Sequence, residues 1–301
     1  MRKIALATSN EYANLTQENR DLLNKLLFWG VDVEPIVWSS HDVPWNQYDA
    51  VFIRSCWDYH LHYDDFFKWI QTLENEGVAV FNSPAILRWN SNKRYLKDLG
   101  DKGINLVPTV WVETGAPTSL QDILAQNGWE KAVIKPCVAA DAYGACLTSG
   151  DRSQDDAMLR TMLEKHGEII VQKFIPEVQQ FGEWSFIFFD GQFSHAVIKK
   201  PQEGDFRVQE KFGGTSKGQR PPRELIEQAS QAIRVLPDVG LYARVDAIQV
   251  DRTLLLVELE MLEPTLFLDY HPKAVERFGN CILTRLNELA VSQGLRQPIS
   301  T

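Results

Sequence analysis

Short apolar segments alternate with helical patterns through the first 85 residues, and this alternation restricts the fold more than any other feature of the chain. Two segments, Gln17–Phe28 and Tyr63–Glu74, carry apolar side chains at helical spacing. The strands that we expect around them are Lys3–Ala7, Val31–Val37, Ala50–Ile53 and Val78–Phe81. Strands that alternate with helices build a parallel sheet covered by helices. The chain is therefore predicted to begin with an α/β unit.

A ligand-binding edge is predicted where the third of these strands ends. Open parallel sheets bind ligands at the carboxyl ends of their strands, and residues 54–59 lie directly after Ile53. We expect Arg54 to bind a substrate carboxylate and Asp58 to bind an ammonium group, with Trp57 and Tyr59 as the walls of a small pocket. The alternative is that Arg54 and Asp58 pair with each other and that Trp57 belongs to the core.

Two common nucleotide motifs are missing from the sequence. The turn after the first strand, residues 7–12, contains no glycine that would admit a pyrophosphate, and no Walker A motif occurs anywhere. We therefore interpret the N-terminal unit as a platform for a substrate rather than as a dinucleotide-binding domain.

From about Asn90 the pattern changes to short strands and hairpins. Further helices are expected at Asn92–Leu99, Leu120–Asn127, Ala157–His166, Arg223–Val235 and Pro272–Ala290. Further strands are expected at Val107–Val112, Ala132–Lys135, Cys146–Leu147, Glu168–Phe174, Glu183–Phe189, Gln192–Lys199, Ala243–Val250 and Leu254–Glu260. Asp190-Gly191 predicts a tight hairpin turn. The polar stretch from Pro201 to Pro222 is predicted to be a structureless lid or binding loop.

The strongest chemical signal is a group of charges on two late strands. Arg244 and Asp246 share one face of their strand, and Glu258 and Glu260 share one face of the next. A turn at residues 251–252 would bring all four side chains onto one surface. Carboxylates on strands whose other face is apolar need a counter-ion, and Mg²⁺ shared with nucleotide phosphates meets that need. The alternative is a solvated strand face with a surface salt bridge.

Two lysines also stand in unusual contexts. Lys135 ends the apolar strand Ala132–Ile134, and Lys93 is expected at the start of a helix, where its charge opposes the helix dipole. A nearby anion would offset that cost, although a lysine in such a position, taken alone, is more often an ordinary surface residue. His60 and His62 lack a third ligand at metal-binding spacing, so we interpret them as surface residues.

Composition excludes several classes of protein. Hydrophobic residues make up 44% of the chain and charged residues 24%, which is typical of a globular protein. The formal charge of −9 argues against nucleic acid as a partner, and the apolar runs are far too short to span a membrane. The cysteines lack the spacing of a zinc site, and polar residues interrupt the N-terminal apolar stretch before a signal peptide could form. We expect a cytoplasmic protein.

Read in order, the motifs resemble the ATP-grasp ligase superfamily, with a match that runs from about Asn90 to Glu288. The segments that carry the resemblance are Lys93, Lys135-Pro136, Gln172-Lys173-Phe174-Ile175, Gly204-Asp205-Phe206-Arg207, Arg244-x-Asp246 and Glu258-x-Glu260. The chain is most similar to the branch containing the ribosomal-protein glutamate ligase, which has a matching Glu-Gly-Asp-Phe-Arg and Gly-Gly order. The Arg54-Ser-x-Trp-Asp-Tyr segment also resembles the group that includes the cycloserine-forming cyclo-ligase.

The resemblance implies an α/β chain, α+β overall, with an ATP-grasp fold behind a parallel-sheet N-terminal domain. The implied parts are residues 1–88, a first ATP-grasp lobe at 89–176 and a C-terminal lobe with the metal site at 177–301. The implied cofactors are ATP and Mg²⁺. By resemblance, Lys93 and Lys135 contact the phosphates, Lys173, Phe174 and Ile175 face the adenine, and Glu183 holds the ribose. Asp246, Glu258 and Glu260 would hold Mg²⁺, with Arg244 and Arg207 on the transferring phosphoryl group.

Two departures from the family pattern stand out. Glu260 replaces the expected Asn of the Glu-x-Asn pair, which adds negative charge to the metal site. The phosphate-covering loop, residues 139–144, keeps only Gly144 of the expected glycines, and Asp141 within it would need compensation by a metal or a lysine.

The activity implied is an ATP-dependent ligase that forms a C–N bond on a small amino-acid-like substrate through an acylphosphate. The similarity to the cycloserine group favours ring closure of one substrate and a role in antibiotic biosynthesis. A dipeptide ligase, a small-molecule kinase and a nucleotide-binding module without turnover stay open as alternatives. The sequence leaves the substrate, the number of metal ions and the assembly state, including a homodimer, open.

Overall fold

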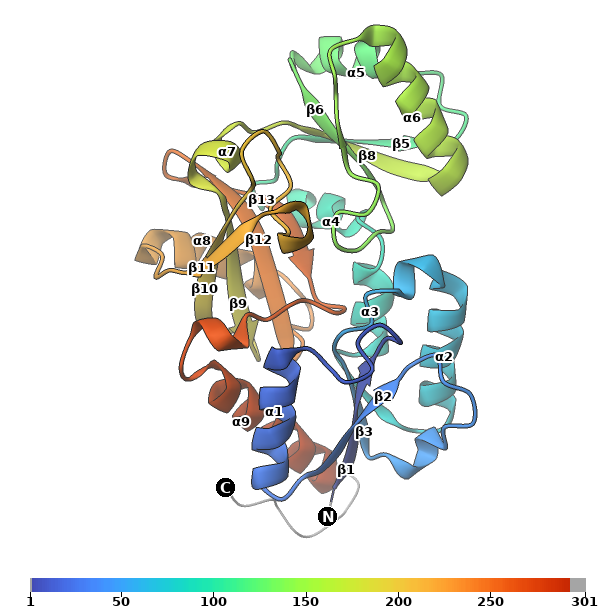
Figure 1. Ribbon diagram of the computed structural model, residues 1–301, viewed down its shortest axis with the longest axis vertical. Helices are drawn as coiled ribbons and strands as arrows, with labels where there is room; N and C mark the ends of the chain where they lie inside the picture. The colour runs from blue at the N-terminus through green and yellow to red at the C-terminus, as the bar shows by residue number, and fades with distance from the viewer. Residues whose placement is uncertain (1, 293–301) are drawn as a thin grey trace.

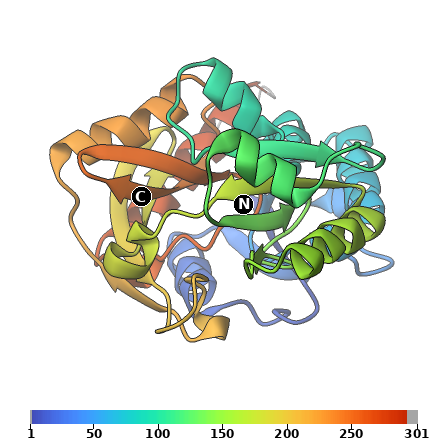
Figure 2. The same ribbon diagram turned by 90° about the horizontal axis from the view of Figure 1, so that it is seen from above.

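The structure is a computed structural model that describes residues 2–292, and it consists of three parts around a common centre (Figure 1). The blue N-terminal unit lies beside the part that carries strands β9–β13. The green lobe with α5 (Leu120–Asn127) and α6 (Arg152–His166) forms one end of the molecule. Seen from that end in Figure 2, the green lobe lies in front of both other parts.

The N-terminal unit has the parallel sheet that its alternating pattern predicts, in the order β2-β1-β3-β4. The strands are β1 (Lys3–Thr8), β2 (Asp32–Val37), β3 (Ala50–Ile53) and β4 (Ala79–Phe81), and the helices are α1 (Gln17–Phe28) and α2 (Tyr63–Asn75). Helix α1 buries Leu22 and Leu26 at helical spacing and is followed by Gly30, whose φ is +79°. The expected α/β unit is confirmed.

The green lobe is an antiparallel sheet in the order β5-β8-β6-β7, covered by α5 and α6. Its strands are β5 (Thr109–Glu113), β6 (Ala132–Pro136), β7 (Cys146–Leu147) and β8 (Glu168–Lys173). Local signals fix its helices: Ser119 and Asp122 form a capping box at the start of α5, and Gly128 ends it in the left-handed conformation.

The remaining part is a sheet in the order β11-β10-β9-β12-β13, in which every neighbouring pair is antiparallel. Its strands are β9 (Glu183–Phe189), β10 (Gln192–Lys200), β11 (Thr215–Gly218), β12 (Tyr242–Val250) and β13 (Thr253–Glu260). Its helices are α7 (Glu177–Phe181), α8 (Arg223–Arg234) and α9 (Ala274–Ser292). Asp190 and Gly191, with φ of 48° and 73°, form the predicted hairpin turn between β9 and β10.

Two predictions about the connections are wrong in detail. The helix expected at Asn92–Leu99 begins only at Tyr95, as α4 (Tyr95–Asp101), because the backbone N–H of Lys93 donates to Cys137 O (2.9 Å) and keeps Lys93 in a turn. Helix α3 (Pro84–Asn90) precedes this turn and was not predicted. The stretch from Pro201 to Pro222 contains β11, which pairs with β10, and a short 3-10 helix at Glu210–Phe212.

Buried polar side chains join the N-terminal unit to β12 and β13. Asn82 donates to the carbonyls of Tyr242 (2.8 Å) and Met261 (2.7 Å), and its own Oδ1 accepts from the backbone N–H of Leu241. The Tyr242 hydroxyl donates to Ile53 O at 2.7 Å. These bonds hold the end of β3 close to the strands that carry the charged cluster. Within residues 2–292, the helices are too short or too polar to span a membrane.

Candidate active site

A cavity of about 840 Å³ lies where the three parts meet. Its volume is in the range of small-molecule and cofactor sites. Every residue that the sequence predicts for the site, with the exception of Arg54, lines this cavity. Residues far apart in the chain therefore share one space.

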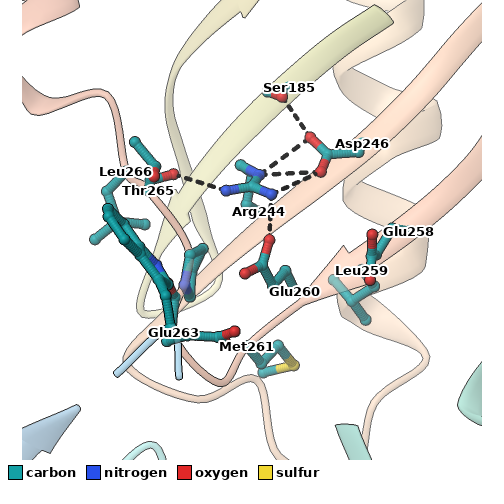
Figure 3. Close-up of polar contacts among 12 residues, drawn as sticks. Ser185, Arg244, Asp246, Glu258, Leu259, Glu260, Met261, Glu263, Thr265 and Leu266 are labelled. Carbon is teal, nitrogen blue, oxygen red and sulfur yellow. Dashed lines mark hydrogen bonds and ion pairs between the residues drawn. The ribbon is translucent and has the colours of Figure 1, made fainter. Parts of the chain in front are cut away.

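The face predicted for β12 and β13 forms as expected. Arg244 pairs with Glu260 in the strand register, and Asp246 pairs with Glu258. Arg244 donates from Nε to both oxygens of Asp246 (3.1 and 3.0 Å) and contacts Glu260 (Figure 3). Its third contact is the carbonyl of Thr265 at 3.2 Å. Arg244 is thus held on three sides, with its guanidinium at the cavity wall.

The carboxylates of this face differ in their electrostatics. Burial raises the pKa of Asp246, but Arg244 and Lys199 outweigh burial and lower it to about 2. Burial, reinforced by Glu258 and Asp246, raises the pKa of Glu260 to about 7 despite Arg244. The charged form of Glu260 is therefore destabilised by burial and by its acidic neighbours, and a cation beside it would stabilise that form.

Two predicted lysines face the same cluster. Lys93 Nζ lies 2.9 Å from Glu258 Oε1 and donates to Ala139 O at 2.9 Å. Burial lowers the pKa of Lys93, but Glu258 outweighs it and the net shift is upward. Lys135, at the end of β6, has its pKa lowered by burial, which exceeds the opposing effects of Glu258 and Glu183. Lys93 is therefore paired with Glu258, whereas the carboxylates near Lys135 do not offset its burial.

Lys199 is a member of the site that the sequence reading missed. Its Nζ lies 2.6 Å from Glu183 Oε1 and 3.2 Å from Asp246 Oδ1, and only 6% of the residue is exposed. The signal was present, because Lys199 ends the apolar run of β10 as Lys135 ends that of β6. A search of the sequence for every lysine at the end of an apolar strand would have found Lys199 together with Lys135.

The segment Lys173–Ile175 passes along the cavity at the end of β8. The backbone N–H groups of Lys173 and Phe174 donate to Pro108 O (2.9 Å) and Lys131 O (3.0 Å). The segment is therefore fixed to its own lobe.

Two loops meet across the mouth of the cavity. Asp141 pairs with Lys211, which is the lysine compensation that the acidic loop residue was expected to need. Arg207 donates to Asp205 (2.7 Å) and lies over the Phe212 ring at 3.8 Å. The pair with Asp205 orients Arg207 while leaving it on the cavity wall.

Arg54 is not placed as the sequence predicted. Only 1% of it is exposed, and it is absent from the described cavity lining. Its Nε donates to Asn19 Oδ1 (2.9 Å), and its NH2 group contacts Pro264 O (3.2 Å) and Glu18 (3.6 Å). Helix α1 supplies the acidic partner, Glu18, from 36 residues upstream. The guanidinium therefore points into the contact between the N-terminal unit and the chain after β13, rather than into the cavity.

The neighbours of Arg54 are also engaged within the protein. Asp58 accepts from Trp38 Nε1 at 2.8 Å, so the alternative pairing with Arg54 is wrong too. Trp57 donates to the carbonyl of Glu263 at 2.8 Å and, like Tyr59, lines the cavity. The two aromatic residues of this segment thus line the cavity, whereas its two charged groups form internal contacts.

The carboxylates do not form a preassembled metal cage. Within residues 2–292, His, Cys, Asp and Glu side chains do not gather in threes in a metal-binding arrangement. The partly exposed Glu258 and Glu260 nevertheless lie on the cavity wall beside Asp246. Mg²⁺ commonly takes one or two carboxylates together with substrate phosphates and water. The donor set fits an ion of that kind, bound together with a nucleotide.

Two families match different parts of the chain. Residues 4–82 match the N-terminal domain of D-cycloserine synthetase DcsG. Residues 104–270, more than half of the chain, match the ATP-grasp domain of prokaryotic glutathione synthetase.

Individual proteins of both kinds are also similar to this chain. The cycloserine biosynthesis protein DcsG of Streptomyces lavendulae is 26% identical over 297 residues, which cover 94% of this chain and 98% of that protein. A glutathione synthetase of Prochlorococcus marinus (strain MIT 9313) is 27% identical over 199 residues, which cover 65% of this chain and 60% of the relative.

Solved structures share the fold. The crystal structure of D-cycloserine synthetase DcsG has a TM-score of 0.85 and 23% identity, and covers 94% of this chain and 99% of that one. A D-alanine–D-alanine ligase from Bacillus anthracis, complexed with ATP, has a TM-score of 0.71 and 17% identity, and covers 98% and 100% of the two chains.

Proposed function

The chain belongs to the family of the prokaryotic glutathione synthetase ATP-grasp domain, and from this premise we propose that it is an ATP-dependent carbon–nitrogen ligase for a small amino-acid-like substrate. The observation that carries the proposal is the shared cavity, in which lysines from two parts of the molecule face the carboxylates of β12 and β13. An array of this kind can hold a polyanion through its cations and a metal ion through its acids.

Residue roles are part of the proposal. Lys93 and Lys135 bind the phosphates of ATP, Lys173–Ile175 lie along the adenine, and Glu183 holds the ribose. Asp246, Glu258 and Glu260 are the carboxylates for Mg²⁺, which when bound would neutralise phosphate charge. Arg244 and Arg207 lie on the transferring phosphoryl group. Residues 1–88 act as the substrate platform, and the lobes 89–176 and 177–301 enclose the nucleotide.

The chemistry requires positioning more than covalent help from the protein. A carboxylate oxygen of the substrate attacks the γ-phosphorus of ATP, the bond to ADP breaks, and an acylphosphate forms. A nitrogen nucleophile then attacks the acyl carbon, phosphate leaves, and the nitrogen loses a proton. Arg244 suits the first step because its planar donors can engage two oxygens of the phosphoryl group at once.

We further propose that the second step is a ring closure within one substrate. The support is the match of residues 4–82 to the N-terminal domain of D-cycloserine synthetase, since the substrate platform belongs to this part of the chain. Full-length similarity to a cycloserine biosynthesis protein supports the same reading and a role in antibiotic biosynthesis. Because the reaction consumes ATP, the proposal places the enzyme in the cytoplasm.

The test is a product analysis with ATP, Mg²⁺ and a panel of amino acids. The proposal requires ADP and free phosphate in equal amounts, both dependent on the amino acid. ADP with the phosphate retained on the organic product would indicate a kinase, and no ADP would indicate a binding module. Product with the mass of two joined amino acids would contradict ring closure but not ligation.

A further inference from the structure

The carboxylates around the cavity floor differ in whether a protein group satisfies them. Asp246 accepts from Arg244 and Lys199, Glu258 pairs with Lys93, and Glu183 pairs with Lys199. Glu18, from α1, accepts the backbone N–H groups of Leu266 (3.3 Å) and Leu268 (3.1 Å). Each of these acids has a partner of opposite polarity.

Glu263 is the exception. It lines the cavity, only 2% of the residue is exposed, and within residues 2–292 its Oε2 has no hydrogen-bond partner. In Figure 3 the Glu263 side chain lies below Arg244 and Glu260, and no dashed contact reaches it. A buried carboxylate oxygen without a partner is costly, and burial accordingly raises the pKa of Glu263 well above its usual value. A ligand that supplies a cation there would stabilise the charged form.

The position of Glu263 indicates which ligand group that is. Its carbonyl accepts from Trp57 Nε1, which fixes it against the N-terminal unit, whereas Lys93 lies on the side of Glu258. Burial, reinforced by Glu263, raises the pKa of Tyr59, and Trp57 and Tyr59 line the same cavity as Glu263. Glu263 is therefore anchored to the substrate platform, whereas Lys93 makes its ion pair with Glu258.

We propose that Glu263 is the specificity-determining residue that binds the amino group of the substrate. This inference rests on the proposed function and takes over the role that the sequence gave to Asp58, whose Oδ1 is occupied by Trp38. An ammonium group carries donors for a carboxylate, and a cation is also attracted to aromatic faces such as those of Trp57 and Tyr59. Glu260 and Glu258 add negative potential and raise the affinity for a cation further.

The experiment compares amino acids with their des-amino counterparts. The probes are D- and L-serine and D- and L-alanine, paired with 3-hydroxypropanoate and propanoate. ADP formation gives kcat and KM, and thermal shift gives binding without turnover. In Glu263→Gln we expect the KM of the amino acids to rise roughly 10- to 100-fold, with the KM of ATP and the half-saturating Mg²⁺ concentration unchanged. The preference for an amino acid over its des-amino counterpart should largely disappear.

Two further variants make the result specific. Glu263→Asp keeps the charge and should keep part of the preference. Glu210→Gln removes an exposed carboxylate that lines the same cavity and should leave the preference unchanged.

The outcomes separate the inference from the proposed function. An unchanged preference in Glu263→Gln, or a shift in Mg²⁺ dependence without a change in the KM of the amino acids, would overturn the inference and leave the ligase standing. If the wild type forms no ADP with the panel, the proposed function fails. In that case a loss of amino-acid binding in Glu263→Gln still supports the inference, and equal binding by both proteins overturns it.

Discussion

The charge of Lys135 is only partly compensated by its own surroundings. Burial lowers its pKa, so the site destabilises the ammonium form until an anion binds. We expect Lys135→Ala to raise the dissociation constant of ATP roughly 10- to 100-fold, because a charge-assisted contact is lost. Calorimetric titration with ATP measures this. Lys68→Ala, which removes an exposed lysine of α2, is the control, and equal affinities in both variants would exclude Lys135 from the nucleotide site.

Arg54 should act on stability rather than on substrate affinity. Arg54→Ala leaves the buried Glu18 without its ion-pair partner, and breaking a buried pair in this way costs about 3–5 kcal/mol. Denaturant unfolding measures the loss. The control is Arg88→Ala, whose partner Glu74 is partly exposed and whose removal should cost less than about 1 kcal/mol. A selective rise in the KM of the amino acid at unchanged stability would restore the role predicted from the sequence.

Whether the position of a side chain could be predicted from the sequence depended on how far along the chain its partners lie. Arg244, Asp246, Glu258 and Glu260 were predictable because strand alternation and a short hairpin fix which side chains share a face. Arg54 was not, because its partner Glu18 comes from a helix 36 residues away. No local pattern marks Glu263, which lies in irregular chain after β13.

At the scale of elements, β10 supports the segment that carries Glu263 through a buried histidine. His195 Nε2 lies 3.0 Å from the carbonyls of both Leu266 and Phe267. Burial lowers the pKa of His195 to about 4, against about 6.5 in an unfolded chain. Below pH 6.5 the unfolded chain therefore binds a proton that the folded chain does not.

The free energy of unfolding should consequently fall as the pH drops from about 6.5 to about 4, with a contribution from His195 of about 3 kcal/mol. Denaturant unfolding at a series of pH values should show a shallower decline for His195→Asn than for the wild type. His41→Asn, at an exposed position, should keep the wild-type slope. Equal slopes in all three proteins would mean that His195 does not carry this dependence.

Element prediction failed where tertiary contacts redirect the chain. Residues 201–222 are mostly polar, yet Thr215–Gly218 forms β11 because β10 offers an open edge with which to pair. Lys93 stays outside a helix because its backbone bonds to Cys137. Both outcomes depend on distant partners that the local sequence does not name.

At the scale of the whole molecule, the parallel unit and the two antiparallel sheets are joined so that their separate charges share one cavity. Asn82 and Tyr242 tie the N-terminal sheet to β12 and β13. The strand patterns predicted the N-terminal sheet and most strands of the other two, but the way the sheets meet depends on such buried contacts. The resemblance to a known family, rather than periodicity, was what linked the distant motifs into one site.

The central claim is that the enzyme activates a substrate carboxylate as an acylphosphate. The most direct measurement labels the carboxylate of the accepted amino acid with the heavy isotope of oxygen and follows the label by mass spectrometry of the released phosphate. We expect one labelled oxygen atom in each phosphate, because the oxygen that attacked the γ-phosphorus leaves with it. Phosphate that carries no label, released at the rate of ADP formation, would contradict the claim.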